Sequence, residues 1–116
     1  MTIYISLPIT GHDPEERRGC AEAAKLGLRS LYPDAEIVTP FEIADRVDDL
    51  NPYAGYADYM KEDIAFIIEH ADAVCFLVNP RTTSSNGVKL EWQTAKIYHK
   101  KILTYGWPRV HTVHIR

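Results

Sequence analysis

Apolar and polar positions follow two different periods along the chain, and the two periods alternate. Short apolar runs predict strands at 2–7, 35–39, 71–78 and 102–105. Between these runs, apolar residues recur every three or four positions, which is typical of helices that bury one face. The pattern predicts helices at 14–32, at 56–70, and from the stretch 84–91 to about His99.

The first helix has clear signals at both ends. Asp13 is expected to be its N-cap, with Pro14 at the first helical position and Glu16 three residues after the cap. The pair 33–34 (Pro-Asp) ends it. Four residues are expected to form its inner stripe: Ala21, Ala24, Leu28 and Leu31.

Two segments are less regular. We expect 41–55, which crowds acidic residues with Asn, Pro and Gly, to form a short helical turn and then a loop. Such a loop either covers a ligand site or is a mobile connection. The tail at 110–115 alternates apolar with polar residues, which fits an edge strand or a segment packed on another subunit.

The alternation of strands and helices predicts an α/β fold. We expect one domain over 1–116, with three layers of the flavodoxin or Rossmann type and a parallel sheet of four to five strands. In such sheets, ligands bind at the carboxyl ends of the strands. This rule brings the segment 4–11, Asp63 and the segment 85–91 around one pocket.

Composition and charge narrow the function classes. Apolar residues make up 46% of the chain and charged residues 25%, as in soluble globular proteins. A formal net charge of −3 gives no electrostatic footprint for duplex nucleic acid, so a small-molecule ligand is expected. The sequence carries no signal peptide and no membrane-spanning run, which predicts a cytoplasmic protein.

The cysteines and histidines suggest no metal site. Cys20 and Cys75 fall within a helical and a strand pattern, where reduced core thiols are expected. The spacing of the histidines fits no metal-ligand set, and we expect these four to be surface groups: His12, His99, His111 and His114.

Glu91 is the first candidate for chemistry. At helical spacing it shares the apolar stripe with Val88 and Ala95, so its carboxylate is expected to face inward. Burying a carboxylate is costly unless hydrogen-bond donors or a ligand compensate, and a helix start supplies free N–H groups. The alternative is a surface Glu in the first turn, where acidic residues are common.

Asp63 is the second candidate. It falls on the apolar face of the 56–70 helix, with Tyr56, Tyr59, Met60, Ile64, Ile67 and Ile68. Surface positions for an acid were available nearby, at Glu62 and Glu69. The alternative is an Asp that caps a neighbouring loop.

Three motifs taken together resemble the nucleoside 2-deoxyribosyltransferase superfamily. They are the run 4–11 (YISLPITG), Asp63 ahead of the strand that starts at 71, and Ser85-x-Gly87-x-x-x-Glu91. The resemblance covers nearly the whole chain. Within the superfamily, the sequence is similar to the nucleotide N-glycosidase branch and to small bacterial and phage members. It implies a flavodoxin-like fold, no cofactor and a homodimer or higher homo-oligomer.

The resemblance also implies roles for individual residues. Glu91 would be the nucleophile at the anomeric carbon, Tyr4 would hold its carboxylate, and Asp63 would position the sugar or protonate the leaving base. The implied substrate contacts come from the first loop and the last helix start: Ser6, Pro8, Ile9, Thr10, Gly11, Ser85, Asn86 and Gly87. With a short deletion after Pro108, Thr112 would match a hydroxyl given to the phosphate by the neighbouring subunit.

Ser85 separates the two branches of this superfamily. The transferase branch has an Asp at this place, which binds the sugar 5′-hydroxyl, whereas the nucleotide hydrolase branch has a Ser and binds a 5′-phosphate. A hydroxyl and the free N–H groups of a helix start suit a phosphate. The expected reaction is therefore cleavage of the N-glycosidic bond of a nucleoside 5′-monophosphate.

Some positions depart from the hydrolase branch, and alternatives stay open. Leu7-Pro8 replaces a Gly-Ser pair, which removes one backbone donor. Base specificity is expected at 45–51 or at 39–42. Base exchange between deoxynucleosides is one alternative, and a non-catalytic nucleotide-binding module is another. The module would be favoured if Lys89 or Arg81, and not a substrate, engaged Glu91.

Overall fold

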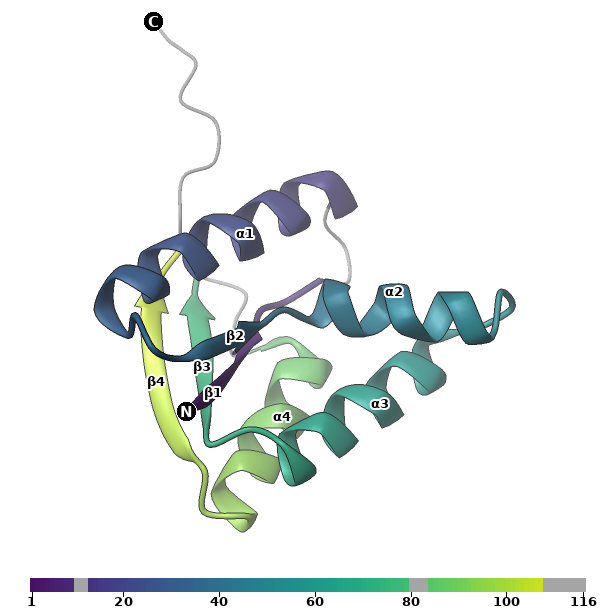
Figure 1. Cartoon of the computed structure of the whole chain (residues 1–116). Helices are drawn as coiled ribbons and strands as arrows, with labels where there is room; N and C mark the ends of the chain where they lie inside the picture. The colour runs from purple at the N-terminus through teal and green to yellow at the C-terminus, as the bar shows by residue number, and fades with distance from the viewer. Residues whose placement is uncertain (10–12, 80–83, 108–116) are drawn as a thin grey trace, which may run out of the picture.

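The computed structural model describes residues 1–9, 13–79 and 84–107. Within these residues, strands and helices alternate along most of the chain (Figure 1). The elements are β1 (Thr2–Ser6), α1 (Pro14–Leu31), β2 (Glu36–Val38), α2 (Pro40–Leu50), α3 (Tyr56–Glu69), β3 (Ala73–Val78), α4 (Asn86–Ile97) and β4 (Lys101–Gly106). None of the described helices is both long and apolar enough to cross a membrane.

The four strands form one parallel sheet in the order β2-β1-β3-β4. β1 is central and pairs with β2 through Tyr4 and Val38, and with β3 through Ser6 and Phe76. The prediction of a parallel α/β sheet of four to five strands is confirmed. The order reverses between β1 and β3, and the carboxyl ends of these two strands therefore flank the crevice in which such sheets bind ligands.

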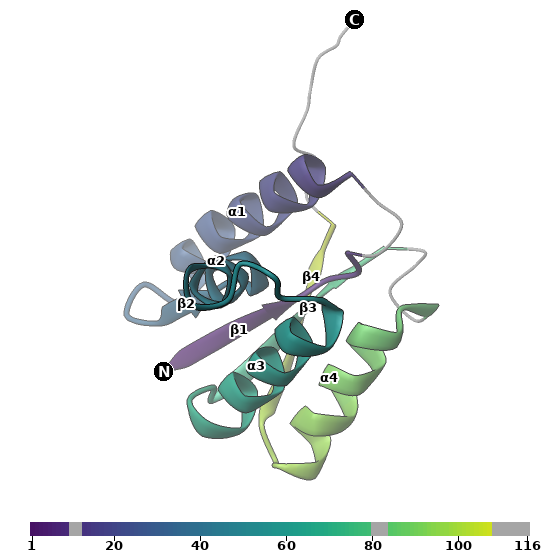
Figure 2. The same ribbon diagram turned by 90° about the vertical axis from the view of Figure 1, so that its right-hand side faces the viewer.

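Helices cover both faces of the sheet (Figures 1 and 2). α1 packs on one face, where Cys20, Ala24 and Leu28 meet the odd-numbered residues of β1. α3 and α4 pack on the other face, and Ile67 and Ala95 belong to its core. This is the three-layer arrangement of flavodoxin-like folds, as predicted.

One residue of the predicted α1 stripe lies outside the core. Ala21, Ala24 and Leu28 are buried as expected, but the side chain of Leu31 is 64% exposed. Leu31 is the last residue of α1, and the next residue, Tyr32, packs against the core in its place. The apolar period continues to the last residue of α1, but the sheet does not extend far enough to cover that residue.

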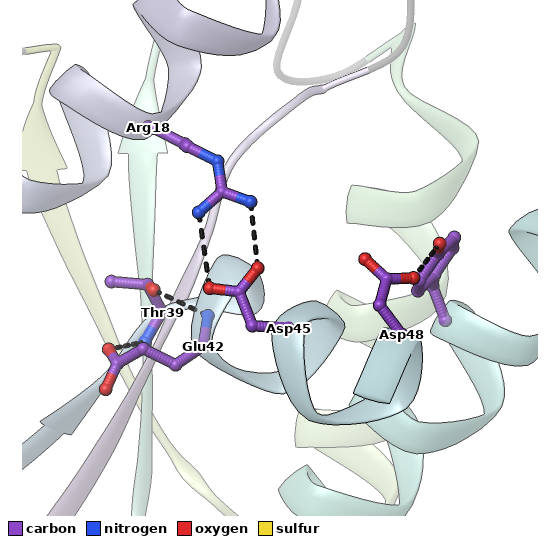
Figure 3. Close-up of polar contacts among 6 residues, drawn as sticks. Arg18, Thr39, Glu42, Asp45 and Asp48 are labelled. Atoms are coloured by element: carbon purple, nitrogen blue, oxygen red, sulfur yellow. Dashed lines mark hydrogen bonds and ion pairs between the residues drawn. The ribbon is translucent and has the colours of Figure 1, made fainter. Parts of the chain in front are cut away.

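The prediction of a short turn and a loop over 41–55 is wrong for most of that segment. α2 runs from Pro40 to Leu50 with Thr39 as its N-cap. Thr39 Oγ1 accepts from the Glu42 N–H at 3.2 Å, and the Glu42 carboxylate accepts from the Thr39 N–H at 2.9 Å (Figure 3). This capping box, with Pro40 at the first position, was a readable helix signal that the acidic composition obscured.

Polar contacts attach α2 to the helices on either side. Arg18 of α1 forms an ion pair with Asp45 at 2.9 Å, and Lys25 forms one with Glu42 at 3.0 Å. On the other side, Asp48 accepts a hydrogen bond from the hydroxyl of Tyr59 in α3 (Figure 3). These contacts link α2 to α1 and to α3.

Candidate active site

Glu91 faces inward from α4. Its side chain is 5% exposed, and Val88 and Ala95 are buried beside it. The prediction that this acid lies within the apolar stripe is therefore confirmed, and the alternative of a surface Glu is wrong. A buried carboxylate needs hydrogen-bond donors to remain ionised.

Two hydroxyl groups of β1 supply those donors. Tyr4 Oη donates to Glu91 Oε2 at 2.7 Å, and Ser6 Oγ donates to Glu91 Oε1 at 2.6 Å. Both distances are typical of strong O–H···O⁻ bonds. Residues two apart in a strand point to the same face, so β1 presents both hydroxyls to one carboxylate. Each carboxylate oxygen is held by a separate donor.

The resemblance implied that Ser6 contacts the substrate, but in the structure Ser6 lies behind the pocket lining. Its side chain is fully buried and does not line the pocket. It binds Glu91 from behind, and so it holds the carboxylate in place. The two-residue spacing of Tyr4 and Ser6 in a strand predicts that both hydroxyls point to the same face of the sheet. The sequence does not show that Glu91 lies against that face and accepts from both of them.

Asp63 lies in α3, also at the pocket. Its side chain is 6% exposed, and its Oδ1 has no hydrogen-bond partner among the described residues. An Asp that capped a loop would spend its oxygens on backbone N–H groups. The orphaned oxygen instead leaves Asp63 ready to bind a ligand or to carry a proton.

The two acids ionise in a defined order. Burial raises the pKa of Glu91 to about 7, although the hydrogen bonds from Ser6 and Tyr4 oppose this rise. Burial, and then the negative charge of Glu91, raise the pKa of Asp63 to about 8. Burial also raises the pKa of Tyr4 well above its usual value, so its hydroxyl keeps its proton. The two donors on Glu91 favour its ionised form, whereas the Oδ1 atom of Asp63 has no donor among the described residues, so Glu91 is the more acidic of the two.

A pocket of about 820 Å³ opens in front of these side chains. It lies at the carboxyl ends of β1 and β3, where the fold places a ligand crevice. Its walls come from the segment after β1, the start of α2, one face of α3 and the start of α4. The lining residues are Tyr4, Leu7, Pro8, Ile9, Pro40, Tyr56, Met60, Asp63, Ser84, Ser85, Asn86, Gly87, Val88 and Glu91.

The start of α4 borders the pocket. Ser85 is the N-cap, and its Oγ accepts from the Val88 N–H at 3.3 Å. The hydroxyl proton of Ser85 is still available to a ligand, because an oxygen that accepts one bond can donate another. The N–H groups of Asn86 and Gly87, in the first turn, have no acceptor within the helix. This end of the pocket is suited to an anion.

Several predicted site residues are brought together, and others lie outside the described residues. Besides the acids and Tyr4, the pocket contains Pro8, Ile9, Ser85, Asn86 and Gly87. Outside the described residues lie Thr10, Gly11 and Thr112, the tail at 110–115, and three of the histidines. The walls from Tyr56, Met60 and Ser84 were not predicted, because the residues that a helix contributes to a cavity depend on how the helices pack.

Of the two cations that would favour a pure binding module, only Lys89 lies within the described residues, and it forms no ion pair with Glu91. Lys89 is exposed, and Arg81 lies outside the described residues. Within the part of the chain that the structure describes, Glu91 forms no ion pair. Over the same residues, no group of three or more His, Cys, Asp or Glu is placed to hold a metal ion.

Comparisons with known proteins add a family but no activity. No curated protein and no solved structure matches the chain at a significant level. Residues 1–104 match the model of a family described as a domain of unknown function, DUF4406. That match includes all the strands and helices up to β4 and every described residue of the pocket. The chain therefore belongs to the DUF4406 family.

Proposed function

We propose that the protein cleaves the N-glycosidic bond of a nucleoside 5′-monophosphate, with deoxyribose as the expected sugar, and releases the base. The observation that carries the proposal is the Glu91 carboxylate, which is buried at the pocket and held by one hydroxyl on each oxygen. A site that only bound an anionic ligand would gain nothing from a fixed negative charge. A site that stabilises positive charge on a sugar needs one.

The ionisation order supports different roles for the two acids. Near neutral pH, Glu91 is partly ionised with a pKa of about 7, and Asp63, with a pKa of about 8, is mostly protonated. Two carboxyl groups whose environments separate their pKa values are the usual arrangement of a nucleophile beside a general acid. Glu91 is thus the nucleophile in the proposed reaction, and Asp63 is the acid.

The reaction would proceed in two steps. In the first, a Glu91 oxygen forms a bond to C1′, the bond from C1′ to the base nitrogen breaks, and the Asp63 proton moves to the leaving base. In the second, a water molecule gives a proton to the Asp63 carboxylate and its oxygen attacks C1′, which frees Glu91. The products are the free base and a sugar 5-phosphate, with one water consumed.

The start of α4 supports a phosphate at the other end of the substrate. Ser85, Asn86 and Gly87 offer a hydroxyl and first-turn N–H groups there. Glu91 lies five residues after Asn86, or about 7.5 Å along the helix axis. That separation is comparable with the span of a pentose from its 5′-phosphate to its anomeric carbon. One helix therefore carries both the phosphate donors and the nucleophile.

Base release from a panel of nucleotides and nucleosides tests the proposal. Purified protein is incubated with deoxynucleoside and ribonucleoside 5′-monophosphates and with free deoxynucleosides, and released base is measured by chromatography. We expect release from monophosphates, and a loss of about 10⁴-fold or more in Glu91→Gln, which keeps the shape of the side chain but not its charge. Gln93→Ala, an exposed position on the same helix, is the control.

The other outcomes of this panel identify the alternatives. Exchange of bases between free deoxynucleosides would indicate a transferase. Binding of nucleotides without base release from any of them would leave a non-catalytic binding module. Release that persists in Glu91→Gln would contradict the assignment of the nucleophile.

A further inference from the structure

One face of α3 forms a continuous wall of the pocket. Tyr56, Met60 and Asp63 all line it, at spacings of four and three residues. Their exposure falls in the same order, from 60% for Tyr56, through a half-buried Met60, to 6% for Asp63. The wall thus runs from the mouth of the pocket to its floor, with apolar groups outside and the acid inside.

Tyr56 was predicted to lie on the buried face of this helix, but its ring is largely exposed. It reaches across to the start of α4, because a Cβ on Gly87 would lie 3.4 Å from the Tyr56 hydroxyl and 3.5 Å from the Met60 sulfur. Leu7, Pro8 and Ile9 line the pocket as well. The exposed part of the pocket lining therefore includes the aromatic side chain of Tyr56, beside the start of α4.

We propose that Tyr56 and Met60 form the surface on which the base of the nucleotide rests. The inference builds on the proposed function and identifies the base subsite within it. A planar base stacks on an aromatic ring, and a thioether makes favourable contacts with aromatic groups. A large ring left three-fifths exposed at a pocket mouth gains buried apolar area when a base covers it.

The position of Asp63 agrees with this assignment. It follows Met60 by three residues, or about 4.5 Å along the helix axis, on the same face. A base that rests on Met60 then has one edge within reach of the Asp63 carboxyl, which is where the leaving nitrogens need a proton. The sugar then lies toward Glu91, and the phosphate lies beside the base at the start of α4, which Tyr56 and Met60 also approach.

This subsite would bind the flat face of the base by stacking. Stacking is tolerant of base identity, because every base has a π-face. We therefore expect both purine and pyrimidine nucleotides to bind, with purines binding more tightly because their faces are larger. The sequence placed base specificity at 45–51 or 39–42, but only Pro40 from those segments lines the pocket.

Binding measurements with and without a base test the subsite independently of catalysis. Isothermal titration is carried out in a Glu91→Gln background, so that no base is released, with deoxynucleoside 5′-monophosphates and with deoxyribose 5-phosphate. We expect Tyr56→Ala to weaken the binding of the nucleotides by about 5- to 100-fold and to leave the affinity for the sugar phosphate unchanged. Tyr56→Phe keeps the ring and should bind as its parent does.

Tyr53→Ala is the matched control, since Tyr53 is 93% exposed and does not line the pocket. Unchanged nucleotide binding in Tyr56→Ala would overturn the proposal, as would an equal loss for both ligands. If nucleotides bind through Tyr56 but no base is ever released by the wild type, the base subsite stands and the proposed reaction fails. If the parent protein binds neither ligand, both fail.

Discussion

Removing the Ser6 hydroxyl should change the pH at which the protein becomes active. In Ser6→Ala, Glu91 Oε1 loses its 2.6 Å donor while Tyr4 still binds Oε2. A hydrogen bond to a charged group contributes about 1.5–3 kcal/mol. At 1.36 kcal/mol per pKa unit, its loss raises the pKa of Glu91 from about 7 by roughly one to two pH units.

The sign of the effect follows from the proposed mechanism. The attacking group is the ionised carboxylate, so activity rises as Glu91 loses its proton. A higher pKa moves this acidic limb of the pH profile upward and lowers kcat/KM at pH 6 by about 10- to 100-fold. Above the shifted pKa, the ratio of the two rates should return toward one, while both rates fall because Asp63 loses its proton near pH 8.

Two assays measure this shift. One is kcat/KM for base release from about pH 5 to about pH 10, which extends above the shifted pKa. The other is an NMR titration of the Glu91 carboxyl carbon, which requires no catalysis. The control is Thr94→Val, which removes another buried hydroxyl, one that donates to the Leu90 carbonyl at 2.8 Å. A Glu91 pKa unchanged in Ser6→Ala, or shifted equally in the control, would refute the reasoning.

Other variants test the general acid and the packing of the fold. Asp63→Asn should slow base release by about 10²–10⁴-fold and remove the basic limb of the rate near pH 8. Because the raised pKa of Asp63 lets the folded state keep a proton that the unfolded state loses, the free energy of unfolding should fall from about pH 4 to 8, less so in Asp63→Asn. Gly27→Ala would place a Cβ 1.9 Å from the Tyr105 hydroxyl, so we expect a destabilisation of about 1–3 kcal/mol, partly offset by about 1 kcal/mol of helix propensity and visible in a denaturant titration. A double-mutant cycle of Arg18→Ala and Asp45→Ala should give a coupling below about 1 kcal/mol, because both side chains are about half exposed; a much larger value would contradict this.

Much of this protein could be predicted from local patterns in the sequence. Strand and helix periods depend only on which residues a neighbouring element will cover, and they located seven of the eight described elements. The same period placed Glu91 and Asp63 on buried faces, because an acid in an apolar stripe turns inward with its helix. The exception is α2, because its capping box between Thr39 and Glu42 starts a helix in a segment whose residue composition is typical of a loop.

Apart from the contact between Tyr4 and Glu91, which the family resemblance implied, only the tertiary structure decided what the buried acids meet. The hydroxyls of Tyr4 and Ser6 lie 87 and 85 residues from Glu91 in the chain, and no local pattern relates them. Their contact depends on α4 packing on the face of the sheet to which both hydroxyls point, and it opposes the rise in the pKa of Glu91. The exposed ring of Tyr56 is likewise a result of packing, since the helical period marks it as buried while the pocket leaves it open. A sequence determines which way a side chain turns on its own helix, but the energy of a buried charge depends on groups that only the folded chain brings to it.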